Sequence, residues 1–199
     1  VNILESLRKI KKNCNAIMIT SDKCYRNKEW VWGYREIDEL GGPDPYSASK
    51  AAAELAIRSY FESYYKSSNI KLASVRAGNV IGGGDWSKDR IVPDIVRALN
   101  KNSEIIVRNP NSTRPWQHVL EATMGYLILG ACLKTNRKVN GEAFNFGPST
   151  SKNYKVIDCA NQMQKYWPEI KWQYKKSKKF NESNLLKLNS GKAYKILKW

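Results

Sequence analysis

The sequence is poor in histidine, cysteine and acidic residues, and each shortage excludes a kind of protein. The 199 residues include one histidine, His118, and four cysteines: Cys14, Cys24, Cys132 and Cys159. No pair of cysteines has the short spacing of zinc ligands, so no metal site is expected. The cysteines also do not suggest a disulfide framework, and a reducing cytoplasm is the simpler expectation. No apolar run is as long as a membrane span, so no membrane partner is expected.

Acidic residues are too few to balance the basic ones. The chain has 34 Lys and Arg against 18 Asp and Glu, a formal net charge of +16. Such an excess is typical of nucleic-acid binding, but it also arises when lysines are spread over solvated faces. The densest cluster, "YKKSKKF" (174–180), is accompanied by no helix-turn-helix, zinc-finger or RNP-type pattern. We therefore expect no nucleic-acid partner, and note that an anionic small substrate would suit a basic cleft.

The hydrophobic pattern alternates between helices and short apolar strands. We expect an irregular polar loop over 21–45 and a glycine-rich loop over 78–89. The expected helices are 2–12, 46–65, 90–101, 118–134, 154–167 and 190–199, and the expected strands are 16–20, 70–77, 104–107, 142–147 and 170–174. Strands that alternate with helices of ten or more residues predict a parallel sheet covered on both faces.

The segment "DPYSASKAAAEL" (44–55) places a tyrosine four residues before a lysine at the start of a helix. Pro45 suits the first helical position, and the alanines that follow are strong helix formers. Tyr46 and Lys50 then share one face, and a nearby ammonium lowers the pKa of a phenol, so that it can act as a base. The alternative is a surface tyrosine and a solvated lysine on an ordinary helix.

Two predicted strands end in polar or glycine-rich residues, "AIMIT-SDK" and "LASVRA-GN", and the helix of Tyr46 lies between them. Ligands of parallel sheets bind beyond the carboxyl ends of the strands. The two strand ends and the start of the Tyr46 helix are therefore expected to converge on one region, which favours a functional role for Tyr46 and Lys50.

Five motifs in order, "TSDKCY", "PYSASK", "VRAGNVIGGGDW", "RNPNSTRPWQHVLE" and "AFNFGP", resemble the extended short-chain dehydrogenase/reductase family. "EWVWGYRE" and "RPWQHVLE" favour the branch that dehydrates CDP-glucose. The resemblance implies an α/β fold: a partial Rossmann-like, doubly wound parallel sheet with a smaller α/β substrate-binding domain. It also implies NAD as cofactor, a nucleotide-sugar substrate, and a homodimer formed through helices 2–12 and 46–65.

The resemblance also implies how the chain is divided. Residues 1–80 match the C-terminal half of the NAD-binding domain, and 81–199 match mainly the substrate domain, with 118–147 returning to the NAD-binding domain. Members of the family begin with a strand, a glycine-rich turn and a helix that hold the NAD diphosphate. No segment here matches that unit, so the chain is expected to be truncated at both ends and to have little or no activity alone.

By resemblance, five residues carry the chemistry. Tyr46 matches the base for the C4 hydroxyl of the sugar, and Lys50 the residue that lowers its pKa and binds the nicotinamide ribose. Ser21 matches the hydroxyl that bonds to the C4 oxygen. Asp22 matches the acid that protonates the departing C6 hydroxyl, a role for which burial should raise its pKa. Lys23 stands where many relatives have a glutamate base, and a lysine serves as a base only with a lowered pKa.

Further residues match binding positions. Ala77 and Gly78 match backbone beside the nicotinamide, and Asn79 a contact to a substrate phosphate. Arg90 and Arg114, and less strongly Arg108, match the cations that hold the nucleotide diphosphate, a task for which forked guanidinium groups are suited.

Three further residues have no single reading. His118 fits a packing role at a helix N-terminus, Trp116 fits stacking on a base or core packing, and Asn145 fits shaping of the substrate loop.

Two alternative functions remain open at this point. A related nucleotide-sugar epimerase or dehydratase has similar motifs, but an epimerase needs no acid at position 22. A catalytically inert fragment or a basic binding module would explain the charge but not the ordered motifs.

Overall fold

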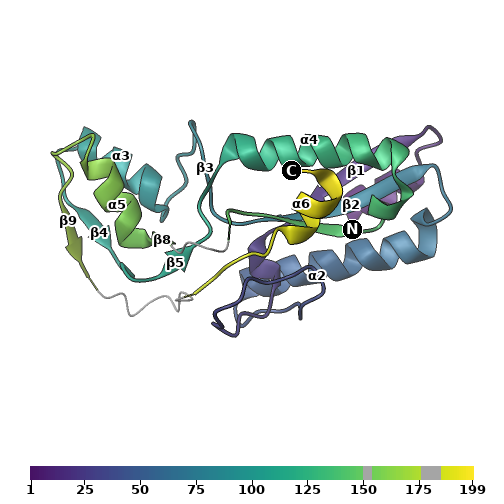
Figure 1. The fold of residues 1–199 in the computed structure, drawn as a ribbon, viewed down its shortest axis with the longest axis horizontal. Helices are drawn as coiled ribbons and strands as arrows, with labels where there is room; N and C mark the ends of the chain where they lie inside the picture. The colour runs from purple at the N-terminus through teal and green to yellow at the C-terminus, as the bar shows by residue number, and fades with distance from the viewer. Residues whose placement is uncertain (150–153, 176–184) are drawn as a thin grey trace.

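The computed structural model describes residues 1–149, 154–175 and 185–199, which form two lobes joined by extended segments (Figure 1). The larger lobe is built around a parallel sheet. The smaller lobe contains short strands and two helices. Most of the basic cluster 174–180 lies outside the described residues.

The sheet of the larger lobe has three parallel strands in the order β1-β2-β7. They are β1 (Cys14–Ile19), β2 (Ile70–Ala77) and β7 (Ala143–Phe146). The central strand β2 is almost wholly buried, as its unbroken apolar run predicts for a strand covered on both faces. Segment 118–147 thus contributes a strand to the same sheet as residues 14–77, and the expected α/β fold with a parallel sheet is confirmed.

One face of the sheet is covered by α1 (Asn2–Arg8), α2 (Pro45–Tyr60) and the π-helical turn η2 (Phe61–Tyr65). Their apolar side chains pack on alternate residues of β2, including Ile70 and Leu72. Helix α1 ends earlier than the predicted helix 2–12. The side-chain amide of Asn69 donates to the carbonyls of Ile10 and Lys12, so this segment forms the connection to β1 instead of another helical turn.

The other face is covered by α4 (Val119–Thr135), the 3₁₀ turn η3 (Arg137–Val139) and α6 (Gly191–Leu197). The opposite side chains of β2, Ala73 and Val75, are buried in this layer with residues of β7 and α4. The larger lobe therefore contains the end of the described chain as well as its beginning.

The smaller lobe has its own apolar core between α3 (Ile91–Asn100), β4 (Ile105–Val107), α5 (Val156–Gln164) and β9 (Trp172–Tyr174). Strands β4 and β9 pair in parallel.

Two further strand pairs consist of two-residue strands. β3 (Val80–Ile81) pairs with β6 (Gln117–His118), and β5 (Thr113–Arg114) pairs with β8 (Tyr154–Lys155). The predictions of an unbroken loop over 78–89 and of a helix from 154 were therefore wrong in part. Two-residue strands have no periodicity, and only their distant partners define them.

The long segment between β1 and α2 begins with the 3₁₀ turn η1 (Asp22–Cys24) and is not a loose loop. Cys24, Tyr25 and Tyr34 are buried with Leu186 and Leu188 from near the end of the chain. The rings of Tyr25 and Tyr34 stack with centroids 5.2 Å apart. This aromatic cluster fixes the segment that carries Ser21 and Asp22 against the sheet.

Candidate functional site

A cleft beyond the carboxyl ends of β1 and β2 is lined by residues of both lobes. Its wall includes ten of the eleven residues singled out from the sequence: Ser21, Asp22, Lys23, Tyr46, Ala77, Gly78, Asn79, Arg90, Arg108 and Arg114. Lys50 is not part of this wall, but its side chain lies next to Tyr46. The cleft is thus at the position where ligands of parallel α/β sheets bind.

The first turn of α2 presents Tyr46 to the cleft. Asp44 caps the helix by accepting from the backbone N–H of Ser47 at 3.0 Å, and Pro45 follows at the first helical position. The Tyr46 ring is 56% exposed, and the Lys50 Nζ lies 5.6 Å from its centroid. The shared helix face expected from the spacing therefore brings the phenol and the ammonium together.

The turn η1 buries a carboxyl group beside the cleft. Ser21 Oγ accepts from the Lys23 backbone N–H at 3.2 Å and donates to Asp22 Oδ1 at 3.0 Å. Asp22 is 4% exposed, and its Oδ2 has no hydrogen-bond partner in the described part of the chain. Burial raises the pKa of Asp22, against the opposing effects of Lys23, the Ser21 hydrogen bond and Arg114. The raised pKa favours the protonated form, as the sequence-based expectation requires.

The end of β2 approaches the cleft as bare backbone. A Cβ atom on Gly78 would lie 2.4 Å from Cγ of Pro115, so this position accepts only glycine without a shift of the neighbouring chain. The Asn79 carbonyl accepts from the Gln117 N–H at 2.9 Å. The strand end is thus fixed: Gly78 allows Pro115 to pack closely against it, and Ala77 and Gly78 both line the cleft.

Three arginines also line the cleft, and each has a partner within the chain. Arg90 pairs with Asp85 at 3.2 Å, and Arg108 pairs with Asp89 at 2.7 Å. Arg114 Nη1 donates to the carbonyl of Thr113 at 2.9 Å. A bound anion at Arg90 or Arg108 would compete with a carboxylate of the glycine-rich segment.

The structure also locates the three residues whose roles the sequence left open. His118 is the N-cap of α4, where its Nδ1 accepts from the Leu120 N–H at 3.2 Å. Trp116 lines the cleft, and its buried indole N–H has no partner among the described residues. Asn145 is fully buried below the cleft, where it contacts the segment after β1.

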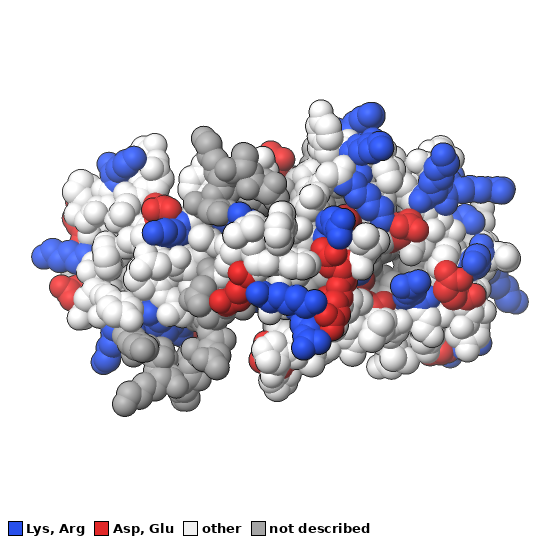
Figure 2. All heavy atoms as spheres, turned by 60° about the horizontal axis from the view of Figure 1, so that its bottom comes forward, with Lys and Arg blue, Asp and Glu red and all other residues white. Residues whose placement is uncertain are grey.

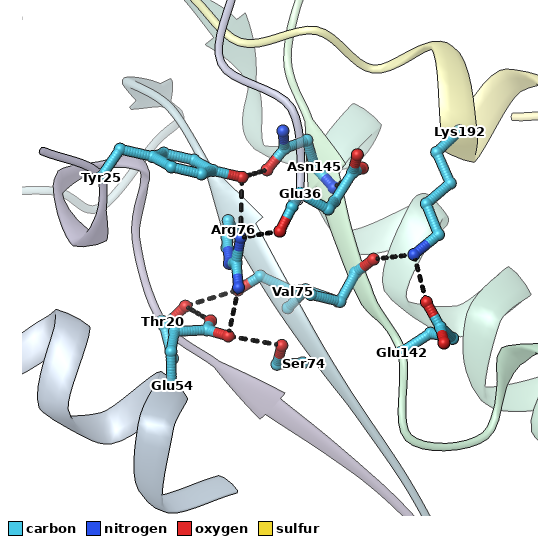
Figure 3. A network of polar contacts seen from close by, with 11 residues as sticks. Thr20, Tyr25, Glu36, Glu54, Ser74, Val75, Arg76, Glu142, Asn145 and Lys192 are labelled. Carbon is cyan, nitrogen blue, oxygen red and sulfur yellow. Dashed lines mark hydrogen bonds and ion pairs between the residues drawn. The ribbon is translucent and has the colours of Figure 1, made fainter. Parts of the chain in front are cut away.

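Sequence reasoning missed a buried polar network that joins α2 to the ends of β1 and β2 (Figure 3). Glu54 of α2 accepts from Thr20 Oγ1, from Ser74 Oγ at 2.9 Å, and from Arg76 Nη2 at 2.7 Å. The side chains of Glu54 and Arg76 are 3% and 5% exposed. This is a buried ion pair between the helix that carries Tyr46 and the strand that ends at Ala77.

The network continues to the third strand. Arg76 Nη1 donates to the Tyr25 hydroxyl at 2.8 Å and to the Glu36 carbonyl at 3.1 Å. The Tyr25 hydroxyl donates to Asn145 Oδ1 at 2.7 Å, and burial raises the pKa of this phenol, so it remains neutral. The available signals were an arginine within the apolar run "LASVRA" and a glutamate one turn after Lys50.

These features define a Rossmann-type α/β protein whose candidate site lies beyond the carboxyl ends of its parallel strands. Among the described residues, no group of three or more His, Cys, Asp or Glu side chains is arranged to hold a metal ion. No helix in the described ranges is long and apolar enough to cross a membrane.

Comparison with known proteins agrees with this class. Residues 1–147 match the NAD dependent epimerase/dehydratase family. The chain is 43% identical over 205 residues to CDP-glucose 4,6-dehydratase of Salmonella typhimurium, with 100% of this chain and 57% of the relative covered. The chain therefore belongs to the NAD dependent epimerase/dehydratase family, and the resemblance seen in its motifs is confirmed.

Solved structures share the fold at low sequence identity. UDP-glucuronic acid 4-epimerase from Bacillus cereus, in complex with UDP-glucuronic acid and NAD, superposes with a TM-score of 0.84 at 18% identity, covering 99% of this chain and 59% of that one. dTDP-glucose 4,6-dehydratase from Bacillus anthracis, in complex with NAD, gives 0.78 at 17% identity, covering 100% and 58%. The chain thus spans a little under three fifths of the length of these relatives.

Proposed function

We propose that the protein containing this chain is an NAD-dependent CDP-glucose 4,6-dehydratase, which converts CDP-glucose to CDP-4-dehydro-6-deoxy-glucose and water. The observation that carries the proposal is the cleft in which Tyr46, Ser21 and the buried Asp22 face the glycine end of β2. The 43% identity to a CDP-glucose 4,6-dehydratase supports the choice of substrate.

The cleft fits the reactive end of a nicotinamide cofactor. Ala77 and Gly78 on the cleft wall, with the exposed Tyr46 and Lys50 beside it, would hold the nicotinamide and its ribose. When bound, NAD would accept a hydride from C4 of the sugar and return it to C6. The chain contains no strand, glycine-rich turn and helix unit for the cofactor diphosphate, and we assign no residue to that group.

The acid–base roles follow from position and burial. Tyr46 takes the proton of the C4 hydroxyl, Lys50 supports its anionic form, and Ser21 bonds to the C4 oxygen. The protonated Asp22 gives its proton to the departing C6 hydroxyl, which its raised pKa supports. Lys23, next to Asp22 on the cleft wall, is the proposed base for the C5 proton.

The substrate's nucleotide diphosphate is assigned to the basic side of the cleft. Arg114 and Arg90, assisted by Arg108 and by Asn79, are the proposed phosphate contacts, because forked guanidinium donors bind phosphate oxygens in pairs. On the face shown in Figure 2, lysines and arginines are interspersed with acidic and neutral side chains. This distribution supports our proposal that the positive charge serves no nucleic acid.

We further propose a homodimer formed through α1 and α2. Both helices expose apolar side chains, including Ile3 and Leu55, and the small residues Ala52 and Ser59 would allow a second copy to approach closely. Light scattering of the full-length protein tests this proposal, and a monomer at high concentration would contradict it. A cytoplasmic location is proposed with it, because four free cysteines suit a reducing compartment.

A related nucleotide-sugar epimerase is the alternative, and it would release the 4-epimer and no water. The deciding experiment incubates the full-length protein with NAD and CDP-glucose and follows the product by mass spectrometry and NMR. We expect loss of one water and a 4-keto-6-deoxy sugar, and a drop of roughly 10²–10⁴-fold in Tyr46→Phe. A product of unchanged mass that is epimeric at C4 would contradict the proposal.

A further inference from the structure

The same face of α2 that presents Tyr46 to the cleft also carries a buried carboxylate. Tyr46, Lys50 and Glu54 follow one another at intervals of four residues, so they lie along one helix face. Tyr46 is exposed at the cleft, whereas Glu54 is buried two turns further along. Glu54 does not line the cleft, and in the family's reaction as proposed above it has no role.

The two oxygens of Glu54 reach the ends of two strands. Its Oε1 accepts from Thr20, the residue before Ser21, and its Oε2 accepts from Arg76, the residue before Ala77. Ser74 donates to the same Oε2 at 2.9 Å. One carboxylate therefore joins three segments distant in sequence, and its bonds to Thr20 and Arg76 are each made one residue before a proposed site residue (Figure 3).

Arg76 extends these contacts to β7 and to the segment between β1 and α2. Its second nitrogen bonds to Tyr25 and to the Glu36 carbonyl, and Tyr25 bonds to Asn145 of β7. Charge-assisted hydrogen bonds are strong in a low dielectric, and a buried charge separated from its partner is costly. The Glu54–Arg76 ion pair therefore favours one arrangement of α2 relative to the ends of β1 and β2.

We propose that Glu54 and Arg76 are positioning residues that fix Tyr46 on α2 relative to Ser21 and Asp22 on η1 and to the backbone at Gly78. Neither residue lies on the cleft wall, so both act through the segments they join. The inference rests on the proposed function, because it names what holds that site in its reactive geometry.

The test compares Glu54→Gln, Arg76→Gln and the double variant in the full-length protein. We expect kcat per folded molecule to fall about 10- to 100-fold, because small misplacements of catalytic groups are costly, while KM for CDP-glucose changes less than about threefold. Because the two residues act as a unit, the double variant should lose no more than the worse single variant. If the kcat losses of the two single variants multiply in the double variant, a joint role is contradicted.

Two further variants separate positioning from stability. Leu133→Ala creates a cavity at the far end of α4, away from the cleft, and should lower Tm while leaving kcat within about twofold. Ser74→Ala removes one bond to Glu54 and leaves the ion pair intact. We expect Ser74→Ala to fold even if Glu54→Gln and Arg76→Gln do not. Its kcat should be about two- to fivefold lower than that of the wild type, with KM unchanged.

Hydrogen exchange gives a readout that needs no activity. Amides of residues 20–23 and 77–79 should lose protection in Glu54→Gln and keep it in Leu133→Ala. If the wild-type protein does not convert CDP-glucose, the proposed function fails, and the exchange data still decide the positioning inference. Unchanged protection in both segments, or a kcat of Glu54→Gln equal to that of the wild type, would overturn it.

Discussion

At the scale of single residues, the turn η1 buries Asp22, the proposed proton donor. Ser21 stabilises one oxygen of Asp22 and caps the turn at the same time. The other oxygen is buried without a partner among the described residues, which favours a neutral carboxyl group. Lys23 is next in the chain, so an acid and a proposed base are placed on the same short turn.

Replacement of Asp22 by asparagine separates the two halves of the proposed reaction. The amide side chain of this variant cannot give up a proton to the C6 hydroxyl, but the substitution leaves Tyr46 and the nicotinamide side unchanged. We expect NAD reduction in a single turnover to persist within a fewfold, and elimination of water to slow by roughly 10²–10⁴-fold. Absorbance of reduced nicotinamide and quenched-flow analysis measure the two steps. Equal loss of both steps would mean that Asp22 is structural.

The raised pKa of Asp22 also predicts a pH-dependent stability. The unfolded chain ionises Asp22 near its ordinary pKa of 3.8, whereas the folded protein holds it protonated to higher pH. The stabilisation that Asp22 contributes is therefore complete below pH 3.8. It is lost as the pH rises through the raised pKa of the folded protein. Denaturant unfolding of the wild type and Asp22→Asn should show the wild type losing stability relative to the variant over this range. A difference independent of pH would contradict the assignment.

At the scale of elements, α2 combines a chemical role with a structural one. Its capped start presents Tyr46, and its middle is fixed to β1 and β2 through Glu54. The turn η1 packs directly against this helix. The relative placement of the proposed catalytic groups is therefore determined by one helix and two strand ends.

The elements themselves were largely predictable, because long periodic segments carry their own signal. The strand 70–77 has the bounds read from its apolar run, and α2 and α4 begin within one residue of their expected starts. The two-residue strands, such as Val80–Ile81, have no such signal. Glu54 and Arg76 were missed as a pair for a related reason: 22 residues separate them, and only the folded sheet brings them together.

The arginine side of the cleft gives a prediction at this scale. Arg114→Ala should raise the Kd for CDP-glucose by about 10-fold or more, because a forked contact to phosphate is lost. Any residual binding of a DNA duplex should be almost unchanged. Arg137→Ala, which removes the same charge from an exposed position on η3, serves as the control. Titrations at near-physiological salt measure both ligands. Tight duplex binding, with CDP-glucose affinity untouched in Arg114→Ala, would contradict the assignment.

At the scale of the whole molecule, the chain forms two lobes with separate cores (Figure 1). Residues of both lobes line the cleft. The chain spans 57% of the length of the CDP-glucose 4,6-dehydratase that it resembles. The chain contributes the proposed catalytic groups and the arginines proposed to bind the nucleotide sugar.

The 199-residue chain on its own is expected to turn over CDP-glucose much more slowly than the full-length protein. We expect weak NAD binding because no segment of this sequence matches the glycine-rich unit that holds the cofactor diphosphate in this fold. Steady-state assays with saturating NAD on both proteins measure the ratio. Equal turnover would show that the chain binds the cofactor without that unit.

The central claim is that this cleft moves the hydrogen of C4 to C6 during dehydration. The most direct measurement uses CDP-glucose labelled with deuterium at C4, incubated with the full-length protein and NAD, with NMR of the product. The account predicts a 4-keto-6-deoxy sugar that carries the deuterium in its C6 methyl group. Recovery of the label at C4 of an epimerised sugar, or a dehydrated product without deuterium at C6, would contradict it.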